Sequence, residues 1–276
     1  MPADKTQLNQ NLGDHLRAFL NEGATATLVT VLKSDRLKTG AKLAIKEDGE
    51  MFGDLGDGSL NKAAAASAAE FLMGREVARS LKVADFAPAL ELFSNTLVLF
   101  ERIEAEPRLV IAGAGHVGAS LSRLAALVGY DVTLIDDRPE FVDRNSFSSA
   151  HEQGIKLITA VRWEDAIREA IGKARGVSVA IVTRGHKQDE DCLRAAIAAQ
   201  PDYVGMIGSK RRTNIVLDKL REEGFDAEEL QKVRAPIGLD IGAVSPEEVA
   251  LAILAEIVSE KRGGMGLPLS QWRRDG

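Results

Sequence analysis

One stretch near the middle of the chain, LVIAGAGHVG at 109–118, limits the possible folds more than any other. An apolar run ends at glycines spaced G-x-G-x-x-G, and a helical pattern follows them. In a turn of this kind Gly113 bends the chain, Gly115 lets the backbone approach a phosphate, and Gly118 lets the helix pack on the strand. The N-terminus of the helix offers free N–H groups to an anion. The stretch therefore predicts a phosphate-binding turn.

An acidic residue follows the turn at a meaningful distance. Asp136 ends the next apolar run, DVTLID, roughly 20 residues further on, where a carboxylate holds a ribose hydroxyl in dinucleotide-binding proteins. Asp137 and Arg138 come next. Two carboxylates would repel a 2′-phosphate, which disfavours NADP, and Arg138 would partly reverse that repulsion. A solvated loop is the other interpretation of Asp137 and Arg138.

The region from residue 105 onward alternates short apolar strands with helices. This pattern predicts an α/β fold: a Rossmann-like, doubly wound parallel sheet. We expect this C-terminal domain to span 105–276 and a smaller α+β domain to span 1–104, with the charged EAEPR segment as the linker. The expected strands lie at 109–115, 131–136, 155–160, 177–183 and 202–208, and the expected helices at 116–129, 163–172, 188–199, 209–224 and 245–261.

The first hundred residues predict a mixed arrangement. A hairpin is expected at 41–55 around the Asp48-Gly49 turn. An alanine-rich segment predicts a long helix capped by Ser59 and running to about Arg79. The remaining elements are a helix at 7–20 and strands at 24–33 and 95–103.

Composition excludes several classes of protein. The net charge of −6 argues against nucleic-acid binding, which usually requires a basic surface. No apolar stretch approaches the roughly 20 residues of a membrane span, and the first residues do not resemble a signal peptide. Cys192 is the only cysteine, so no intrachain disulfide is possible. We expect a cytoplasmic protein.

Two further strand ends carry candidate ligand contacts, since ligands of doubly wound sheets bind at the carboxyl ends of strands. The first holds Thr183, Gly185 and His186, with His186 either a ligand or acid–base residue or an ordinary surface histidine. The acidic residues that follow could join His186 in a metal site, but we favour acidic residues that complement a helix dipole, and no metal. Cys192 is expected to be buried in this helix. The acidic residues are Asp189, Glu190 and Asp191.

The second strand end reads GMIGSKRRT. Gly208 and Ser209 open a helix whose first turn contains Lys210, Arg211 and Arg212. Cations at a helix N-terminus oppose the dipole, so they indicate an anionic ligand; a solvated basic face is the alternative. The glycine-rich loop at 235–248 is long enough to close over the site, and its Asp240 is either catalytic or bonded to loop amides.

Several of these blocks together resemble a known family. The blocks AGAGHVG, VTRGHKQDEDCL, GMIGSKRR and APIGLDIGAVSPEEVALAILAEIV are similar, in that order, to those of the xanthine dehydrogenase accessory factors, the XdhC/CoxI family. The resemblance covers residues 108–263, and LVTVLKS with the hairpin extends it to the smaller domain.

The resemblance implies a non-catalytic maturation factor for molybdenum hydroxylases. Such a factor binds the molybdenum cofactor (molybdopterin), a pterin phosphate or its nucleotide derivative, assists its sulfuration, and inserts it into a xanthine dehydrogenase-type enzyme. The implied partners are the apo-molybdenum hydroxylase and a cysteine desulfurase. The full set of candidate cofactor-binding residues is Gly113, Gly115, His116, Val117, Gly118, Asp136, Asp137, Arg138, Thr183, Gly185, His186, Gly208, Ser209, Lys210 and Arg211.

One position departs from the family pattern. Family members commonly carry Gly-Gly-Cys-x-Glu after the hairpin, and this chain has Ser59 in place of the cysteine. A serine hydroxyl is a poor ligand for a soft metal–sulfur centre. Two other functions therefore stay open: an NAD-dependent oxidoreductase with His186 as its proton-transfer residue, and a nucleotide-sensing regulatory protein without catalysis. An open strand edge favours a homodimer.

Overall fold

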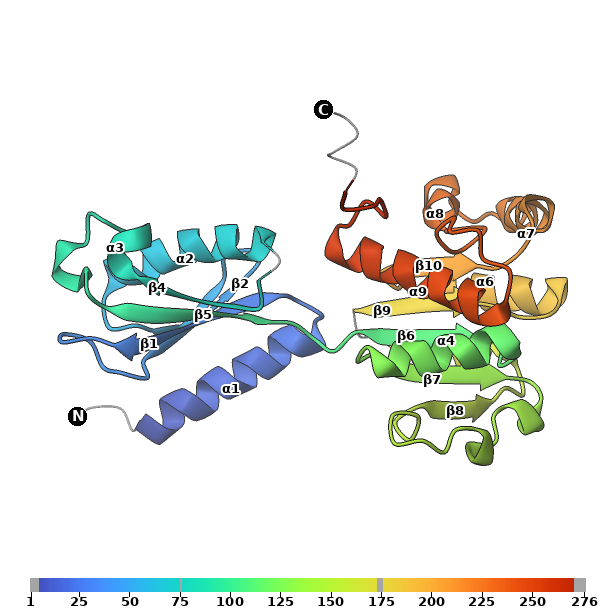
Figure 1. Cartoon of the computed structure of the whole chain (residues 1–276), viewed down its shortest axis with the longest axis horizontal. Helices are drawn as coiled ribbons and strands as arrows, with labels where there is room; N and C mark the ends of the chain where they lie inside the picture. The colour runs from blue at the N-terminus through green and yellow to red at the C-terminus, as the bar shows by residue number, and fades with distance from the viewer. Residues whose placement is uncertain (1–4, 75, 173–175, 271–276) are drawn as a thin grey trace. The chain divides into compact units, whose positions relative to one another are not determined.

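The computed structural model describes residues 5–74, 76–172 and 176–270. The chain divides into two compact units, Met1–Ala105 and Glu106–Gly276 (Figure 1). Each unit contains one five-stranded sheet, so each buries its own apolar side chains. None of the helices in the described part of the chain combines the length and the apolar character needed to cross a membrane.

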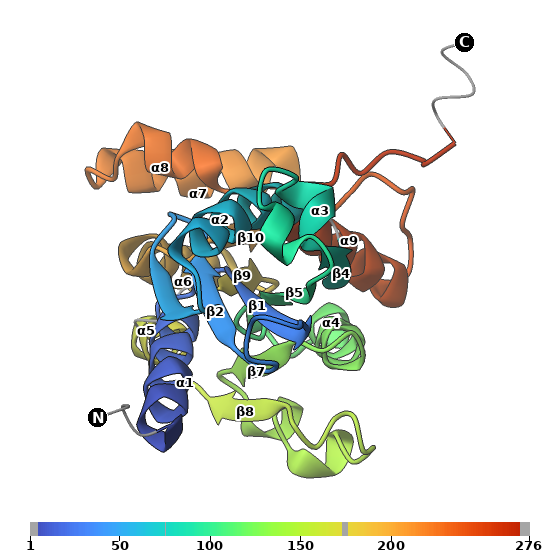
Figure 2. The ribbon, with the colours of Figure 1, turned by 90° about the vertical axis from the view of Figure 1, so that its left-hand side faces the viewer.

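The first unit is built on an antiparallel sheet in the order β3-β2-β1-β5-β4. Alternate residues of β1 point to opposite faces: Val29 and Val31 pack in the cluster that contains α2, and Ala26 in the cluster that contains α1. The two helices therefore cover opposite faces (Figure 2). The elements are α1 (Lys5–Asn21), β1 (Ala26–Lys33), β2 (Lys42–Lys46), β3 (Met51–Asp54), α2 (Gly58–Met73), β4 (Ala78–Lys82), α3 (Val83–Phe86) and β5 (Leu97–Ile103).

The predicted hairpin is confirmed, because β2 pairs antiparallel with β3. The prediction for the helix that follows was wrong in two respects. Asp57 is its N-cap and accepts hydrogen bonds from the N–H groups of Ser59 and Leu60, so Ser59 lies inside the first turn. The helix ends at Met73, and residues 78–82 form the edge strand β4 instead. Gly74 interrupts the helix-forming sequence, and β4 pairs with β5.

The second unit confirms the predicted doubly wound parallel sheet. Its strands pair in parallel in the order β10-β9-β6-β7-β8. Every residue of β9 is buried, as expected of a strand covered on both faces. Its strands are β6 (Arg108–Ala112), β7 (Asp131–Asp136), β8 (Lys156–Thr159), β9 (Val177–Ile181) and β10 (Tyr203–Met206).

Helices cover both faces of this sheet (Figure 1). The side chains of α4 and α9 join one apolar cluster, and those of α5, α6 and α7 join the cluster on the other face. The short helix α8 was not predicted. These helices are α4 (His116–Leu127), α5 (Trp163–Ile171), α6 (His186–Ala199), α7 (Lys210–Glu222), α8 (Ala227–Lys232) and α9 (Pro246–Arg262).

The strand order creates a crevice at one place on the sheet edge. From β6 the chain proceeds outward through β7 and β8, then crosses back to β9 on the other side of β6. The connections after β6 and β9 therefore leave in opposite directions. Ligands of doubly wound folds bind at this reversal, outside the carboxyl ends of the strands.

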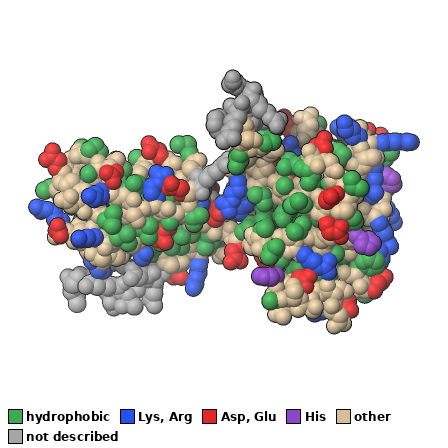
Figure 3. All heavy atoms as spheres, in the orientation of Figure 1, with side chains coloured by type: hydrophobic (Ala, Val, Ile, Leu, Met, Phe, Trp, Pro, Cys, Tyr) green, Lys and Arg blue, Asp and Glu red, His purple; other side chains and the backbone are tan. Residues whose placement is uncertain are grey.

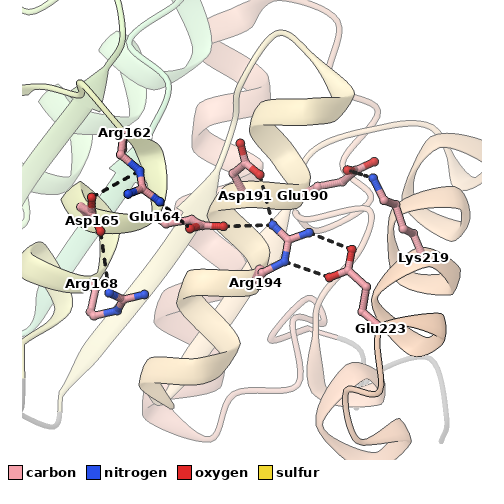
Figure 4. A network of polar contacts seen from close by, with 9 residues as sticks. All are labelled: Arg162, Glu164, Asp165, Arg168, Glu190, Asp191, Arg194, Lys219 and Glu223. Carbon is pink, nitrogen blue, oxygen red and sulfur yellow. Dashed lines mark hydrogen bonds and ion pairs between the residues drawn. The ribbon is translucent and has the colours of Figure 1, made fainter.

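An ion-pair network fixes the helices that begin at this edge. Arg194 of α6 contacts Glu164 of α5, Asp191 of its own helix and Glu223 at the end of α7 (Figure 4). The hydrogen bond to Glu223, the largest cause, holds the pKa of the Arg194 guanidinium above its usual value. The network therefore links three consecutive helices behind the crevice.

Candidate functional site

The three glycines of the turn have different surroundings. Gly113 has φ +109°, and a Cβ there would lie 2.6 Å from the Val182 carbonyl oxygen. A Cβ on Gly118 would lie 1.8 Å from the Gly113 oxygen. A Cβ on Gly115 would have no atom within 4 Å. Gly113 and Gly118 are thus required by packing, whereas Gly115 leaves space for an incoming group.

The helix that follows the turn begins without a side-chain cap. Gly115 is the N-cap residue of α4, has extended backbone, and offers no side-chain acceptor to the first N–H groups. Helix α6 begins in the same way at Gly185. By contrast, Ser209 caps α7 by accepting a hydrogen bond from the Arg212 N–H. Uncapped N–H groups at a sheet edge are suited to binding an anion.

Asp136 is buried behind the turn and is fully engaged by its own chain. Its carboxylate accepts hydrogen bonds from the Ala114 N–H at 2.7 Å and from the Arg138 N–H at 3.0 Å. Arg138 also donates through Nε at 2.8 Å and through Nη2 at 3.1 Å. Burial raises the pKa of Asp136, but the hydrogen bonds from Arg138 and Ala114 outweigh it, so the pKa lies below its usual value. Asp136 is therefore an ionised anchor for the turn.

Asp137 and Arg138 do not form a freely solvated loop. The Arg138 guanidinium stacks on the Phe141 ring at 3.6 Å, with 23% of its side chain exposed. Asp137 lies 3.8 Å from Arg138 Nε and 3.5 Å from Arg184 Nη2. A cavity of about 70 Å³ opens between these groups and the glycine turn. It is lined by Gly113, Gly115, Asp136, Asp137, Arg138, Trp163, Val182, Thr183, Arg184 and Gln188.

A buried ion pair joins the next two strand ends, and sequence reasoning missed it. Asp189 is fully buried and accepts hydrogen bonds from the Thr183 hydroxyl and from Nε of Arg212 at 2.8 Å. Arg212 Nη2 also donates to Asp189. Burial raises the pKa of Asp189 more than these hydrogen bonds lower it. The pair holds the turn after β9 against the first turn of α7.

The other acidic residues of α6 are likewise paired. Glu190 pairs with Lys219 and Asp191 with Arg194 (Figure 4). Of these residues only Asp189 lies in the first turn of the helix, so the expectation that all three complement the dipole was wrong for two of them. In the described part of the chain no three His, Cys, Asp or Glu residues come together as a metal site.

The predicted histidines and basic residues are found at the same sheet edge. His116 and His186 are the first residues of α4 and α6, and Lys210 and Arg211 open α7. No ion pair involves Lys210 or Arg211 among the residues that the structure describes. Figure 3 shows basic and histidine side chains along this end of the second unit, beyond the arrowheads of Figure 1. The candidate residues thus follow the carboxyl ends of β6, β7, β9 and β10. Those that also line the cavity at the glycine turn are Gly113, Gly115, Asp136, Asp137, Arg138 and Thr183.

Three other candidates lie apart from the crevice or lack a visible role. Cys192 is fully buried in the core, as expected, and desolvation raises its pKa well above the usual value. Asp240 is exposed in its loop. Ser59 belongs to the first unit, where it is exposed on the first turn of α2.

Two family models match the chain. Residues 109–257 match the XdhC Rossmann domain, and residues 19–81 match the XdhC and CoxI family. A xanthine dehydrogenase from Bacillus halodurans has a similar fold, with a TM-score of 0.50 and 17% identity over 94% of this chain and 98% of that chain.

Three relatives show sequence similarity. PaoD of Escherichia coli K12, a molybdenum cofactor insertion chaperone, is 26% identical over 87% of this chain and 85% of its own length. A probable xanthine dehydrogenase subunit of Bacillus subtilis 168 is 30% identical over 62% of this chain and 48% of its own length. YqeB of E. coli K12 is 28% identical over 82% of this chain and 41% of its own length. The chain thus spans less than half the length of the Bacillus subtilis relative and of YqeB. On the match of its Rossmann domain and of its first unit, the chain belongs to the XdhC and CoxI family.

Proposed function

We propose that this protein is a maturation factor that binds the molybdenum cofactor by its phosphate end and passes it to an apo-molybdenum hydroxylase. The observation that carries the proposal is the uncapped glycine turn at Gly115. The exposed cations Lys210 and Arg211 begin α7, after another strand of the same sheet. Backbone N–H groups and cations are what a phosphate or diphosphate requires. The similarity to a molybdenum cofactor insertion chaperone supports the assignment of the ligand.

The residues present fit one end of the cofactor. The phosphate and the pterin would lie against the glycine turn, Thr183, Ser209 and Lys210. A thiolate ligand for the metal would have to come from elsewhere, because Cys192 is buried in the core and Ser59 carries only a hydroxyl. When bound, the cofactor would supply the molybdenum centre that the client enzyme requires.

The role of this chain is then to bind the cofactor and release it to the client enzyme. The glycine turn and the cations bind the phosphate, and Asp136 and the Asp189–Arg212 pair keep the walls of the crevice in place. With no thiolate of this chain on the metal, the molybdenum end stays free for a partner. A cysteine desulfurase that installs the terminal sulfur completes the proposal, as the family resemblance implies. The open strand edge adds a homodimeric carrier.

Anaerobic loading followed by transfer tests this function. The protein is incubated with molybdenum cofactor, desalted, and assayed for molybdenum and pterin, then mixed with an apo-hydroxylase. We expect near-stoichiometric binding and recovery of hydroxylase activity, and loss of both in Lys210→Ala/Arg211→Ala. Lys232→Ala/Arg234→Ala, which removes two cations elsewhere in the same unit, serves as the matched control. Molybdenum at background level in the wild-type protein contradicts the proposal.

The departure at Ser59 favours one competing function, a nucleotide-binding regulatory protein. The same experiment separates the two, because a regulator would bind a nucleotide tightly and transfer no molybdenum. An NAD-dependent oxidoreductase is disfavoured by Asp136, whose carboxylate is already occupied by Ala114 and Arg138.

A further inference from the structure

We infer that the ligand presents a phosphate to the end of β7, where Arg138 recognises it, and not a ribose diol to Asp136. The inference deepens the proposed function and rests on it in one respect, namely that a phosphorylated ligand lies on the glycine turn. It reverses the sequence-based expectation that the two carboxylates disfavour a 2′-phosphate.

Asp136 has no acceptor capacity left for a ribose. An ionised carboxylate has about four lone-pair sites for hydrogen bonds. Asp136 accepts one hydrogen bond from Ala114 and three from Arg138. Its side chain is also only 2% exposed. A ribose diol would have to displace Arg138 before it could donate to this carboxylate.

Arg138, by contrast, keeps donors that its own chain does not use. A guanidinium carries five N–H donors, and Asp136 takes one from Nε and one from Nη2. No hydrogen bond joins this guanidinium to another acceptor within the described residues. The remaining donors belong to a group that Asp136 and the Phe141 ring hold in one orientation. A fixed guanidinium fork with free donors suits an oxyanion.

The charges around the cavity balance one another. Asp136 and Asp137 face Arg138 and Arg184, so two carboxylates meet two guanidinium groups. Because the net charge is balanced, a preference for an anion must come from individual N–H donors at the cavity. Arg138 supplies some of these donors, and the uncapped N-terminus of α4 at Gly115 supplies others. The cavity of about 70 Å³ has room for a small group such as a phosphate.

The arrangement predicts opposite effects of one substitution on two ligands. Arg138→Ala removes the phosphate donors and at the same time releases the oxygens of Asp136. A ligand with a 2′-phosphate should bind more weakly to the variant, and a ligand with a free 2′-hydroxyl should bind as well or better. NADPH and NADH differ only by this phosphate and serve as the probes.

Titration of the full-length protein with NADPH and NADH tests the inference. We expect wild type to bind NADPH about tenfold more tightly than NADH, the effect of about one charge-assisted hydrogen bond. Arg138→Ala should reverse the preference, and Arg138→Lys should reduce it, because an ammonium keeps the charge and loses the fork. Arg221→Ala, an exposed arginine at the far end of α7, should leave the ratio unchanged.

Equal or tighter binding of NADH by wild type overturns the inference, as does an unchanged ratio in a folded Arg138→Ala. Failure of both dinucleotides to bind at millimolar concentration overturns it as well. If Arg138→Ala does not fold, the wild-type ratio and Arg138→Lys decide. The molybdenum-transfer assay separates failure of the inference from failure of the proposed function. If the protein prefers NADPH but transfers no molybdenum, only the proposed function is refuted. If it transfers molybdenum but prefers NADH, only the inference is refuted.

Discussion

Helix α2 of the first unit and helix α4 of the second both begin at glycine-containing turns, and their N-termini are completed differently. At the start of α2 the Asp57 carboxylate accepts the N–H groups of Ser59 and Leu60, and Asn61 binds the Leu55 N–H and the Asp54 side chain. At the start of α4 no side chain accepts the first N–H groups, and Gly115 faces open space.

The difference separates a structural turn from a binding turn. The polar groups of the first turn of α2 are used by the chain itself, so that turn stabilises the first unit and needs no ligand. The N-terminus of α4 is held from behind by Asp136 and left free in front. We therefore expect that substitutions in the first turn of α2 lower stability. Substitutions on the open side of the glycine turn before α4 should lower affinity for the ligand.

The largest effect is expected where the binding turn is itself structural. In Gly118→Ala the new Cβ would lie 1.8 Å from the Gly113 oxygen, so the helix must move away from the strand. We expect a loss of about 3 kcal/mol in the free energy of unfolding, typical of severe overpacking, measured by urea denaturation. In the matched control Gly58→Ala, a Cβ meets nothing within 4 Å, and stability should not fall. A Gly118→Ala protein as stable as wild type contradicts the packing role.

The next effect depends on pH. Arg212→Ala leaves the buried Asp189 carboxylate without its partly exposed cation, which should cost about 2 kcal/mol near neutral pH, as for an unsatisfied buried acceptor. The pKa of folded Asp189 already lies above its usual value because of burial, and Arg212 lowers it. Loss of Arg212 should therefore raise this pKa further. The folded state then keeps a proton that the unfolded state releases, so stability is highest below the usual carboxyl pKa and falls as pH rises through the raised one.

Unfolding curves at about pH 5 and about pH 8 measure this dependence. The difference between Arg212→Ala and wild type should be larger at the higher pH. Lys219→Ala removes the exposed partner of Glu190 on the same pair of helices and should change little at either pH. Equal destabilisation of Arg212→Ala at both pH values would falsify the role given to Asp189.

The third effect is on affinity alone. In Gly115→Ala the backbone conformation, φ −63° and ψ −176°, is accessible to alanine, so stability should stay within about 0.5 kcal/mol of wild type. The methyl group would occupy the space through which the phosphate approaches, and affinity for NADPH should fall about tenfold, equivalent to about 1.4 kcal/mol. Calorimetric titration beside a melting curve measures both. Unchanged affinity would show that the ligand does not approach Gly115.

The smallest effect is on stability alone, whereas the third is on affinity alone. Asp57→Ala removes the cap of α2 and should cost about 1 kcal/mol of stability, with no change in affinity for NADPH. Urea denaturation and titration of the same preparation give the two values. A loss of affinity here would show that the first unit takes part in binding.

The arrangement of the second unit could be predicted from sequence because its strands are continuous apolar runs separated by helical patterns. The glycine turn could also be predicted from sequence, since the spacing of its glycines follows from backbone geometry. The first unit was harder. The edge strand β4 is mostly exposed and follows an alanine-rich helix, so local propensity extended the predicted helix into its first residues. Either Asp57 or Ser59 could cap α2, and only the backbone geometry decides between them.

The side-chain contacts that shape the site could not be predicted from the sequence. For Arg138 a ligand contact and a solvated loop both stayed open, because nothing in DDRP shows that its side chain folds back on Asp136. Asp189 and Arg212 lie on different helices, and their pairing depends on how α6 and α7 pack. Sequence patterns report local structure and burial; partners brought together by tertiary packing leave no such pattern.

The molybdenum content of two variants after anaerobic loading tests the central claim most directly. The claim is that the cofactor is held by the glycine turn of the second unit and not by the first turn of α2. Asp57→Ala should retain molybdenum and pterin at the wild-type ratio, and Gly115→Ala should lose both while remaining folded. Molybdenum retained by Gly115→Ala, or lost by Asp57→Ala, would contradict the account.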